Sequence, residues 1–210
     1  MKIVGNGRSL VIGVLAFMVA VCALARDASS LAAAGAQSAS AAPLQAGASE
    51  ASLRRHFTDL PLITQDGRAV RFFSDLLKDR IVLVNFVFTS CSGSCPVLSQ
   101  TFSEIQGLLG ERLGRDVHLI SVSVDPLTDT PAVLKRYSEN FAARPGWTFL
   151  TGKRENIDWV IYKLGQYNEE IEAHSPLILM GDVRAGRWRA LIGSTPPQVV
   201  MAELQKLLKR

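Results

Sequence analysis

The stretch VNFVFTSCSGSCPVLS, residues 84–99, joins a predicted strand to a predicted helix and carries two cysteines. Its beginning continues a run of mostly β-branched and aromatic residues, Ile81–Phe88, which is typical of a strand buried on both faces of a sheet. Cys91 and Cys95 follow four positions apart, with Pro96 directly after them. A strand that leads at once into a helix would place both cysteines at or just inside the helix N-terminus, on one face.

Three roles are open to a cysteine pair at that position. Free N–H groups and the helix dipole lower the pKa of a thiol there, which favours the thiolate needed for redox chemistry or for metal binding. The spacing also allows a disulfide. A purely structural bridge would close a very small loop and would contribute little stability. The pair is therefore a redox switch, part of a metal site or a structural disulfide, and the last of these would stabilise the fold least.

His174 is a candidate third ligand. It comes directly before a predicted strand, Pro176–Met180, whose start should face the cysteine-bearing helix end in a thioredoxin-like sheet. Two thiolates and one imidazole form a soft set that suits Cu(I) and, less specifically, Cu(II) or Zn(II). A lone histidine is more often a surface or hydrogen-bonded residue, and we interpret His56 and His118 as structural.

The N-terminal residues 1–25 differ from the rest of the chain. Two basic residues precede Leu10–Ala25, an uncharged apolar run that ends in small residues, which is typical of a cleaved signal peptide or a short membrane anchor. Either interpretation predicts export. Residues 26–56, rich in Ala and Ser, are expected to be a flexible tether, and residues 57–210 to be the folded domain.

Strand-like and helix-like segments alternate along residues 57–210. The residues Gln65-Asp66-Gly67 predict the turn of an N-terminal β-hairpin. Further predicted strands and helices follow, ending in an antiparallel pair joined through Gly181-Asp182 and a C-terminal helix. The predicted fold is α/β, a thioredoxin-like mixed sheet flanked by helices with the hairpin as an addition. The expected segments are Leu60–Thr64, Ala69–Phe72, Ile81–Phe88, a helix from about 98 to 109, Val117–Val124, a helix from Pro131 to about Phe141, Trp147–Leu150, a helix over Ile157–Leu164, Pro176–Met180, Trp188–Ile192 and a helix over about 199–208.

The chain's composition argues against a nucleic-acid partner. Its 210 residues are 48% hydrophobic, enough for one domain with a sizeable core plus tails. The net charge of +4 is spread along the chain, and no basic run is interleaved with aromatic residues. We therefore predict no nucleic-acid binding, and membrane association only through the N-terminal segment.

Several ordered motifs over roughly residues 57–209 resemble the SCO (SenC) family, the copper-handling proteins of cytochrome oxidase assembly. The resemblance implies a thioredoxin-like domain in the periplasm, attached to the inner membrane if residues 10–25 are retained. It implies that Cys91, Cys95 and His174 bind one copper ion and that Asp125 lies close to the metal site, although an aspartate before proline is equally typical of a turn. The motifs are Phe86-x-Phe88-Thr89-x-Cys91-x-x-x-Cys95-Pro96, Ser123-Val124-Asp125-Pro126, Asp129-Thr130-Pro131, Phe149-Leu150-Thr151-Gly152 and His174-Ser175.

Two functions follow from this set of residues together with the resemblance, which implies the copper-receiving partner. The first is a copper metallochaperone that delivers copper, as Cu(I) or Cu(II), to the copper-receiving subunit of a respiratory oxidase or to another periplasmic copper protein. The second is a thiol-disulfide oxidoreductase acting on the cysteines of a copper protein, in which Cys91 attacks, Cys95 resolves and a thiol reductant restores the pair. A thiol peroxidase is less well supported, because no threonine or arginine signature surrounds Cys91.

Overall fold

The structure is a computed structural model, and it describes residues 49–171 and 176–209. The predicted signal or anchor, residues 1–25, and most of the predicted tether lie outside these residues, as does His174. Within the described ranges, no helix combines the length and the apolar character needed to span a membrane.

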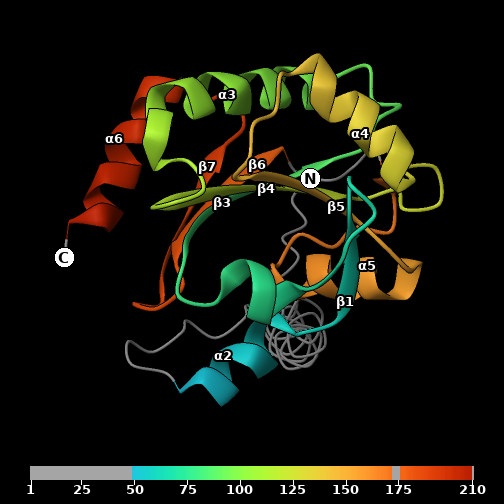
Figure 1. Cartoon of the computed structure of the whole chain (residues 1–210), viewed down its shortest axis with the longest axis horizontal. Coiled ribbons are helices and arrows are strands. Elements are labelled where there is room, and N and C mark those ends of the chain that lie inside the picture. The colour runs from blue at the N-terminus through green and yellow to red at the C-terminus, as the bar shows by residue number, and fades with distance from the viewer. Residues whose placement is uncertain (1–48, 172–175, 210) are drawn as a thin grey trace, which may run out of the picture. The chain divides into compact units, whose positions relative to one another are not determined.

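A seven-stranded mixed sheet forms the centre of the domain (Figure 1). Its order is β2-β1-β5-β4-β3-β6-β7, with β3, β4 and β5 parallel to one another and the remaining pairs antiparallel. The strand before the cysteines, β3, lies inside the sheet between β4 and β6, and all but its first residue are buried. The strands are β1 Pro61–Thr64, β2 Ala69–Arg71, β3 Ile81–Val87, β4 Val117–Ser123, β5 Trp147–Thr151, β6 Leu177–Asp182 and β7 Arg187–Ile192.

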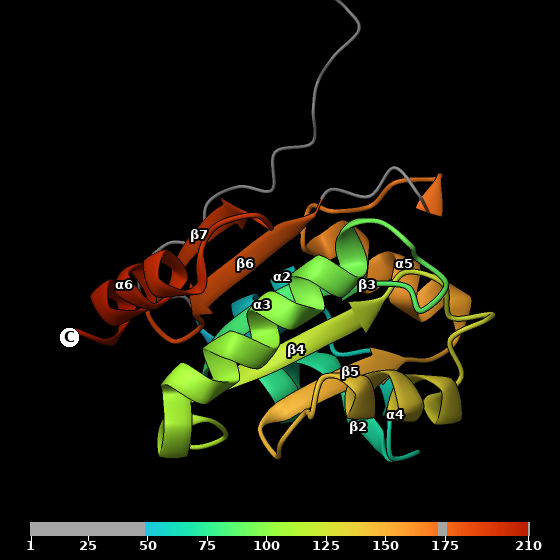
Figure 2. The same ribbon diagram turned by 90° about the horizontal axis from the view of Figure 1, so that it is seen from above.

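Helices cover both faces of the sheet (Figures 1 and 2). One face carries α3 (Ser94–Leu109), α4 (Pro131–Asn140) and α6 (Pro197–Leu208). The other carries α2 (Glu50–Phe57), the π-helix η1 (Phe72–Leu77) and α5 (Arg154–Lys163), and a short 3₁₀ turn, η2 (Gly110–Arg112), follows α3. The α/β class, the mixed sheet and the thioredoxin-like arrangement predicted from the sequence are confirmed.

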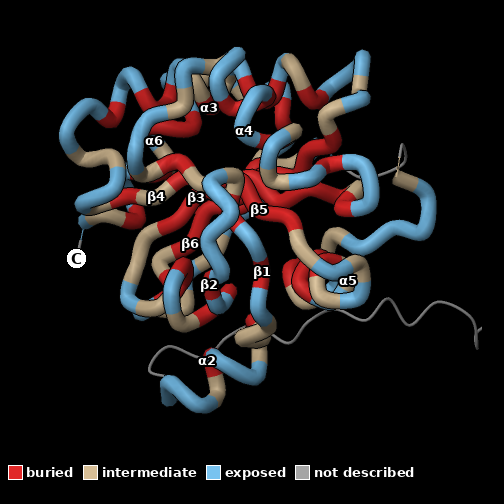
Figure 3. Tube along the Cα trace, turned by 45° about the vertical axis from the view of Figure 1, so that its right-hand side comes forward, coloured by how far each residue is buried: buried red, intermediate tan, exposed pale blue. Residues whose placement is uncertain are grey.

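Two hydrophobic clusters lie back to back against the central strands, which are almost wholly buried (Figure 3). Alternate residues of β3 enter opposite clusters, Leu83 on the α3 side and Val84 and Phe86 on the α5 side. The strand therefore has no solvent-facing side, and this explains why its sequence lacks the alternation of a half-exposed strand. Cys95 belongs to the cluster on the α5 side, although its helix covers the other face.

The predicted N-terminal hairpin is present, with its turn at the expected residues. Strands β1 and β2 pair antiparallel, and Gly67 adopts φ +76° in the turn, where a residue without Cβ is favoured. The predicted second strand extended to Phe72, but this residue begins η1 and is fully buried.

Part of the predicted tether is helical. Residues 50–56, which we assigned to the flexible segment, form most of α2. Ser49 caps this helix by accepting the N–H of Ser52, and Leu53 and Phe57 are buried against η1. The Ala/Ser-rich composition changes only at Glu50, so two buried side chains were too few to reveal an amphipathic pattern.

The turn between β6 and β7 lies later than the sequence predicts. Gly181 and Asp182 are the last residues of β6 and pair with Trp188 and Arg187. A Cβ on Gly181 would lie 2.4 Å from the ring of Trp188, so this glycine leaves room for the indole. The turn uses Gly186 instead, at φ +64°.

Candidate functional site

Cys91 and Cys95 lie where the buried strand β3 meets α3. Cys91 precedes the helix, in the connecting loop, and donates its backbone N–H to Phe88 O at 3.1 Å. Cys95 is the second residue of α3 and is only 1% exposed. The prediction that both cysteines lie at or just inside the helix N-terminus is confirmed for Cys95, in the first turn, whereas Cys91 lies in the loop three residues before the helix begins.

The surroundings of Cys91 favour its thiolate. Partial burial raises the pKa of this thiol, but hydrogen bonds from the Cys95 side chain and from the backbone N–H groups of Cys95, Gly93 and Ser94 outweigh that effect. The net pKa of Cys91 is therefore lowered from its ordinary value. The first N–H groups of α3 have no partner within the helix, and here they point toward the sulfur.

Cys95 has the opposite character. Burial, followed by the hydrogen bond with Cys91, raises the pKa of its thiol to about 12, and the charges of Cys91 and Asp129 add to this effect. At neutral pH the pair therefore holds one more acidic, partly exposed sulfur and one protonated, buried sulfur. This asymmetry is the main electrostatic feature of the site.

Asp129 is a buried carboxylate beside the site, and its position in the Asp129-Thr130-Pro131 motif did not predict this location. It is fully buried and accepts the hydroxyl of Thr89 at 2.5 Å, the hydroxyl of Ser123 at 2.6 Å and the N–H of Thr89 at 3.2 Å. Thr89 precedes Cys91 by two residues, so Asp129 ties the cysteine loop to the end of β4. The available signal was the Asp-Thr-Pro sequence, which reads equally well as the N-terminal cap of α4.

Asp125 lies in the turn between β4 and α4. Its carbonyl accepts the N–H of Thr128 at 3.2 Å and that of Asp129 at 2.9 Å, and its own N–H is donated to the hydroxyl of Ser123 at 3.1 Å. These backbone contacts fit the turn interpretation. The side chain is half-buried, and its role near a metal stays a prediction.

Of the described residues on either side of His174, Pro176 has a contact near the cysteine end of α3. Ile171 packs against the large hydrophobic cluster on the α5 side and lines a small pocket with Val124, which directly follows β4. Pro176 accepts the N–H of Gly193 at 2.6 Å, and a Cβ on Gly193 would lie 3.3 Å from Leu98, one turn after Cys95.

The structure describes His56 and His118, the two histidines that we interpreted as structural. His56 contacts the ring of Phe57 edge-on at 4.7 Å. His118 lies at the start of β4, where burial and then the charge of Arg80 lower its pKa to about 4. Across residues 49–171 and 176–209, no three His, Cys, Asp or Glu side chains gather into a group that could hold a metal ion.

The SCO1/SenC family model matches residues 45–209 of the chain. Among curated proteins, the SCO2-like protein of Rickettsia felis is 37% identical over 105 residues, which cover 50% of this chain and 49% of that protein. The chain thus matches about half the length of this relative.

Solved structures of the same family share the fold. Bradyrhizobium japonicum ScoI with copper bound is 30% identical, with a TM-score of 0.59 over 71% of this chain and 96% of that one. BsSco, described as having a disulfide switch and as a member of the Sco family of cytochrome c oxidase assembly proteins, is 26% identical, with a TM-score of 0.61 over 72% of this chain and 92% of that one. The family model covers most of the residues printed here, from the start of α2 to the end of α6, and the chain belongs to the SCO1/SenC family.

Proposed function

We propose that this chain is an exported copper metallochaperone that binds one copper ion through Cys91, Cys95 and His174 and delivers it to the copper centre of a respiratory oxidase. The observation that carries the proposal is the pair of thiols at the N-terminus of α3, one with a lowered and one with a raised pKa. Related proteins support the cargo, because ScoI of Bradyrhizobium japonicum has been solved with copper bound.

The positions of the residues flanking His174 support its role as the third ligand. From Pro176, whose carbonyl lies beside Gly193 near α3, two peptide units span at most about 7 Å of chain. From the other side, Ile171 packs against the hydrophobic cluster that contains Cys95 and that Cys91 also contacts. We infer that the segment between these flanks brings the imidazole to the two sulfurs.

The donor set fits copper chemically. Two thiolates and an imidazole suit Cu(I), and the same set accepts Cu(II). Cys95 must lose its proton on binding, and since the pKa of its thiol is about 12, uptake should release this proton and weaken as the pH falls. The burial of Cys95 shields one side of the ion, while the partly exposed Cys91 leaves another side open to ligand exchange with a partner.

The second candidate function is thiol-disulfide exchange, and the pKa asymmetry favours it as well. The Cys91 thiolate would attack a client disulfide, forming a mixed disulfide and releasing one client thiolate, which takes up a proton. The Cys95 sulfur, after giving up its proton, would then attack Cys91, release the second client thiolate and leave Cys91 and Cys95 bridged. A thiol reductant must supply the two electrons that reopen the bridge.

A copper titration of the full chain separates the two functions. The reduced protein should bind one Cu(I) per chain, and the oxidised protein should bind none at the same affinity. His174→Ala should lower copper affinity by tenfold or more while thiol-disulfide exchange with a small disulfide continues, and His56→Ala is the matched control. Unchanged copper affinity in His174→Ala would contradict the three-ligand site, and equal uptake by oxidised protein would exclude thiolate ligation.

Asp125 and the N-terminal segment complete the proposal. Asp125 is half-buried in the turn that precedes the buried Asp129, and we place its carboxylate near the metal as an outer partner of a ligand. Asp125→Asn should then change copper affinity without changing the unfolding free energy. If Asp125 serves only in the turn, the same substitution should leave both copper affinity and the unfolding free energy unchanged. Residues 1–25 would direct the domain to the periplasm and, if retained, hold it at the inner membrane.

A further inference from the structure

An open cleft of about 490 Å³ lies at the end of the sheet opposite the cysteines. Cys91 follows the last residues of β3, whereas Arg80, which lines the cleft, directly precedes this strand. Because β4 and β5 run parallel to β3, their first residues meet at the same edge and bring His118 and Thr148 into the cleft. A seven-residue strand spans about 20 Å, so the cleft is a separate site.

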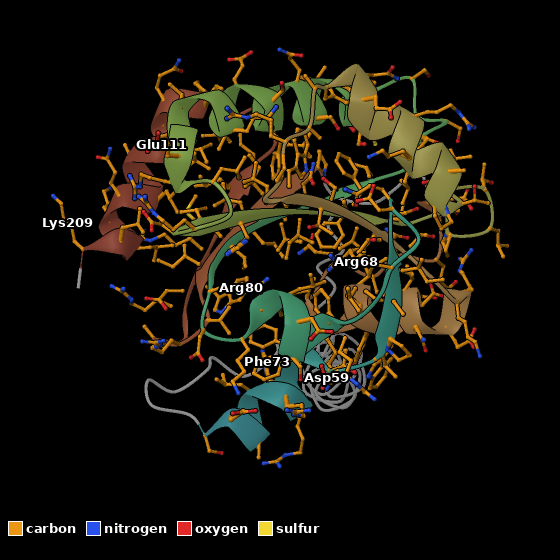
Figure 4. All side chains as sticks on the ribbon, viewed as in Figure 1. Asp59, Arg68, Phe73, Arg80, Glu111 and Lys209 are labelled. Carbon is orange, nitrogen blue, oxygen red and sulfur yellow. The ribbon has the colours of Figure 1, made fainter. Side chains whose placement is uncertain are left out.

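The cleft has an excess of positive charge. Arg68, Arg80 and Arg115 line it, with Asp75 as the one acidic lining residue. Arg115 pairs with neighbouring Asp116 at 3.1 Å. In the part of the chain that the structure describes, Arg68 and Arg80 form no ion pair, and both lie on the side of the sheet that η1 covers (Figure 4).

Backbone packing fixes one wall of the cleft. The loops before β4 and β5 touch through Gly114 and Gly146, and a Cβ on Gly146 would lie 2.6 Å from the backbone nitrogen of Gly114. Gly146 also adopts φ +102°, which disfavours any other residue. The wall therefore needs two glycines in contact, and His118 and Thr148, from the strands that follow these two loops, line the same cleft.

We propose that this cleft binds a phosphate group through the guanidinium groups of Arg68 and Arg80. The planar fork of a guanidinium matches two oxygens of a phosphate, and two such forks without internal partners leave strong donors unused. The hydroxyl of Thr148 adds a neutral donor at the same edge. The group is either a free phosphate or the head of an acidic lipid, since both present the same oxygens to the arginines.

His118 supplies a direct readout of occupancy. Burial and the nearby charge of Arg80 hold its pKa near 4, so the imidazole is neutral at pH 7. A phosphate bound to Arg80 would offset that charge and stabilise the imidazolium, which raises the pKa of His118. Arg68, the second proposed ligand, would be neutralised by the same phosphate, and this acts on the pKa of His118 in the same direction. Arg115 and Asp75, the other charged residues that line the cleft, take no part in the proposed binding.

The test is an NMR titration of the reduced, copper-free full chain with inorganic phosphate, at constant ionic strength with chloride as the balancing anion. The His118 ring signals should shift in a saturable way, and the pKa measured from them should rise when phosphate is bound. Arg68→Gln and Arg80→Gln should each weaken binding about tenfold. Arg136→Gln, an exposed arginine of α4 outside the cleft, is the charge-matched control and should leave binding unchanged.

A second arm uses phosphatidylglycerol vesicles with the same variants, and it identifies the source of the phosphate. Vesicle binding that depends on Arg68 and Arg80, without a response to inorganic phosphate, assigns the cleft to a lipid head group. If Arg80→Gln fails to fold, Arg80→Lys keeps the charge without the fork and should still weaken binding several-fold. The proposal is overturned if neither probe binds, or if Arg136→Gln weakens binding as much as the cleft variants do.

Discussion

Removing the Asp129 carboxylate should destabilise the domain more than removing any exposed acid. The carboxylate accepts two short hydroxyl bonds and one N–H bond from Thr89 and Ser123, and it is fully buried. Hydrogen bonds to a charged group contribute about 1.5–3 kcal/mol each. Their sum is an upper bound, because the half-buried Thr89 regains water in the variant. We therefore expect Asp129→Ala to lower the unfolding free energy by about 3–5 kcal/mol.

The comparison of three variants makes this prediction sharp. Asp129→Asn keeps one acceptor oxygen and should lower the unfolding free energy by only about 1–2 kcal/mol. Asp66→Ala removes an exposed ion pair with Lys135 and should change it by less than about 1 kcal/mol. The measurement is urea unfolding of the reduced protein, followed by circular dichroism. If Asp129→Ala is no less stable than Asp66→Ala, the carboxylate does not hold the cysteine loop to β4 as described.

Three further predictions rest on single residues. Gly146→Ala should lower the unfolding free energy by about 3 kcal/mol or more, because the new Cβ would meet backbone atoms and the residue has a positive φ. Gly107→Ala, which has open space around it in α3, should instead raise the unfolding free energy by about 0.5–1 kcal/mol. Thermal melting of the two variants tests both expectations. Iodoacetamide should modify Cys91 before Cys95 at neutral pH, as followed by mass spectrometry. The rate of Cys91 modification, plotted against pH, should have its midpoint below the ordinary thiol pKa. Modification of Cys95 first would contradict the assignment. The pKa of His118 is about 4 in the folded protein, below the ordinary 6.5, so the unfolded chain binds more protons between these two pH values. The unfolding free energy should therefore fall by about 1–2 kcal/mol as the pH drops from 6.5 to 4. His118→Gln should lose this pH dependence.

The parts of the fold that depend on long patterns could be predicted from the sequence. The unbroken apolar run of β3, the hairpin turn at Gly67 and the Thr130 cap of α4, which accepts the N–H of Val133, all follow from local chemistry. Helix α2 could not, since only tertiary packing gives its two buried residues a role. Gly181 was assigned to a turn because sequence alone does not show the ring of Trp188 above it.

The candidate site was predicted only in part for the same reason. Adjacent residues were enough to place Cys91 and Cys95 at a strand–helix junction. The raised pKa of Cys95 depends on burial by distant residues, and the contact of Asp129 with Thr89 joins positions forty apart. Such long-range contacts leave no periodic signal in a single sequence, so the carboxylate beside the site became evident only from the fold.

Both described cysteines lie at the connection between β3 and α3, so a disulfide between them would not link parts of the chain that are distant in sequence. A link that closes so small a loop contributes at most about 2 kcal/mol, whereas the two hydrophobic clusters hold the sheet and helices independently. The domain should thus keep its shape in reducing and oxidising buffers, and its melting temperature should differ between them by at most about 4–8 °C. The cysteine pair can therefore change between the dithiol and the disulfide without a change in the fold of the domain.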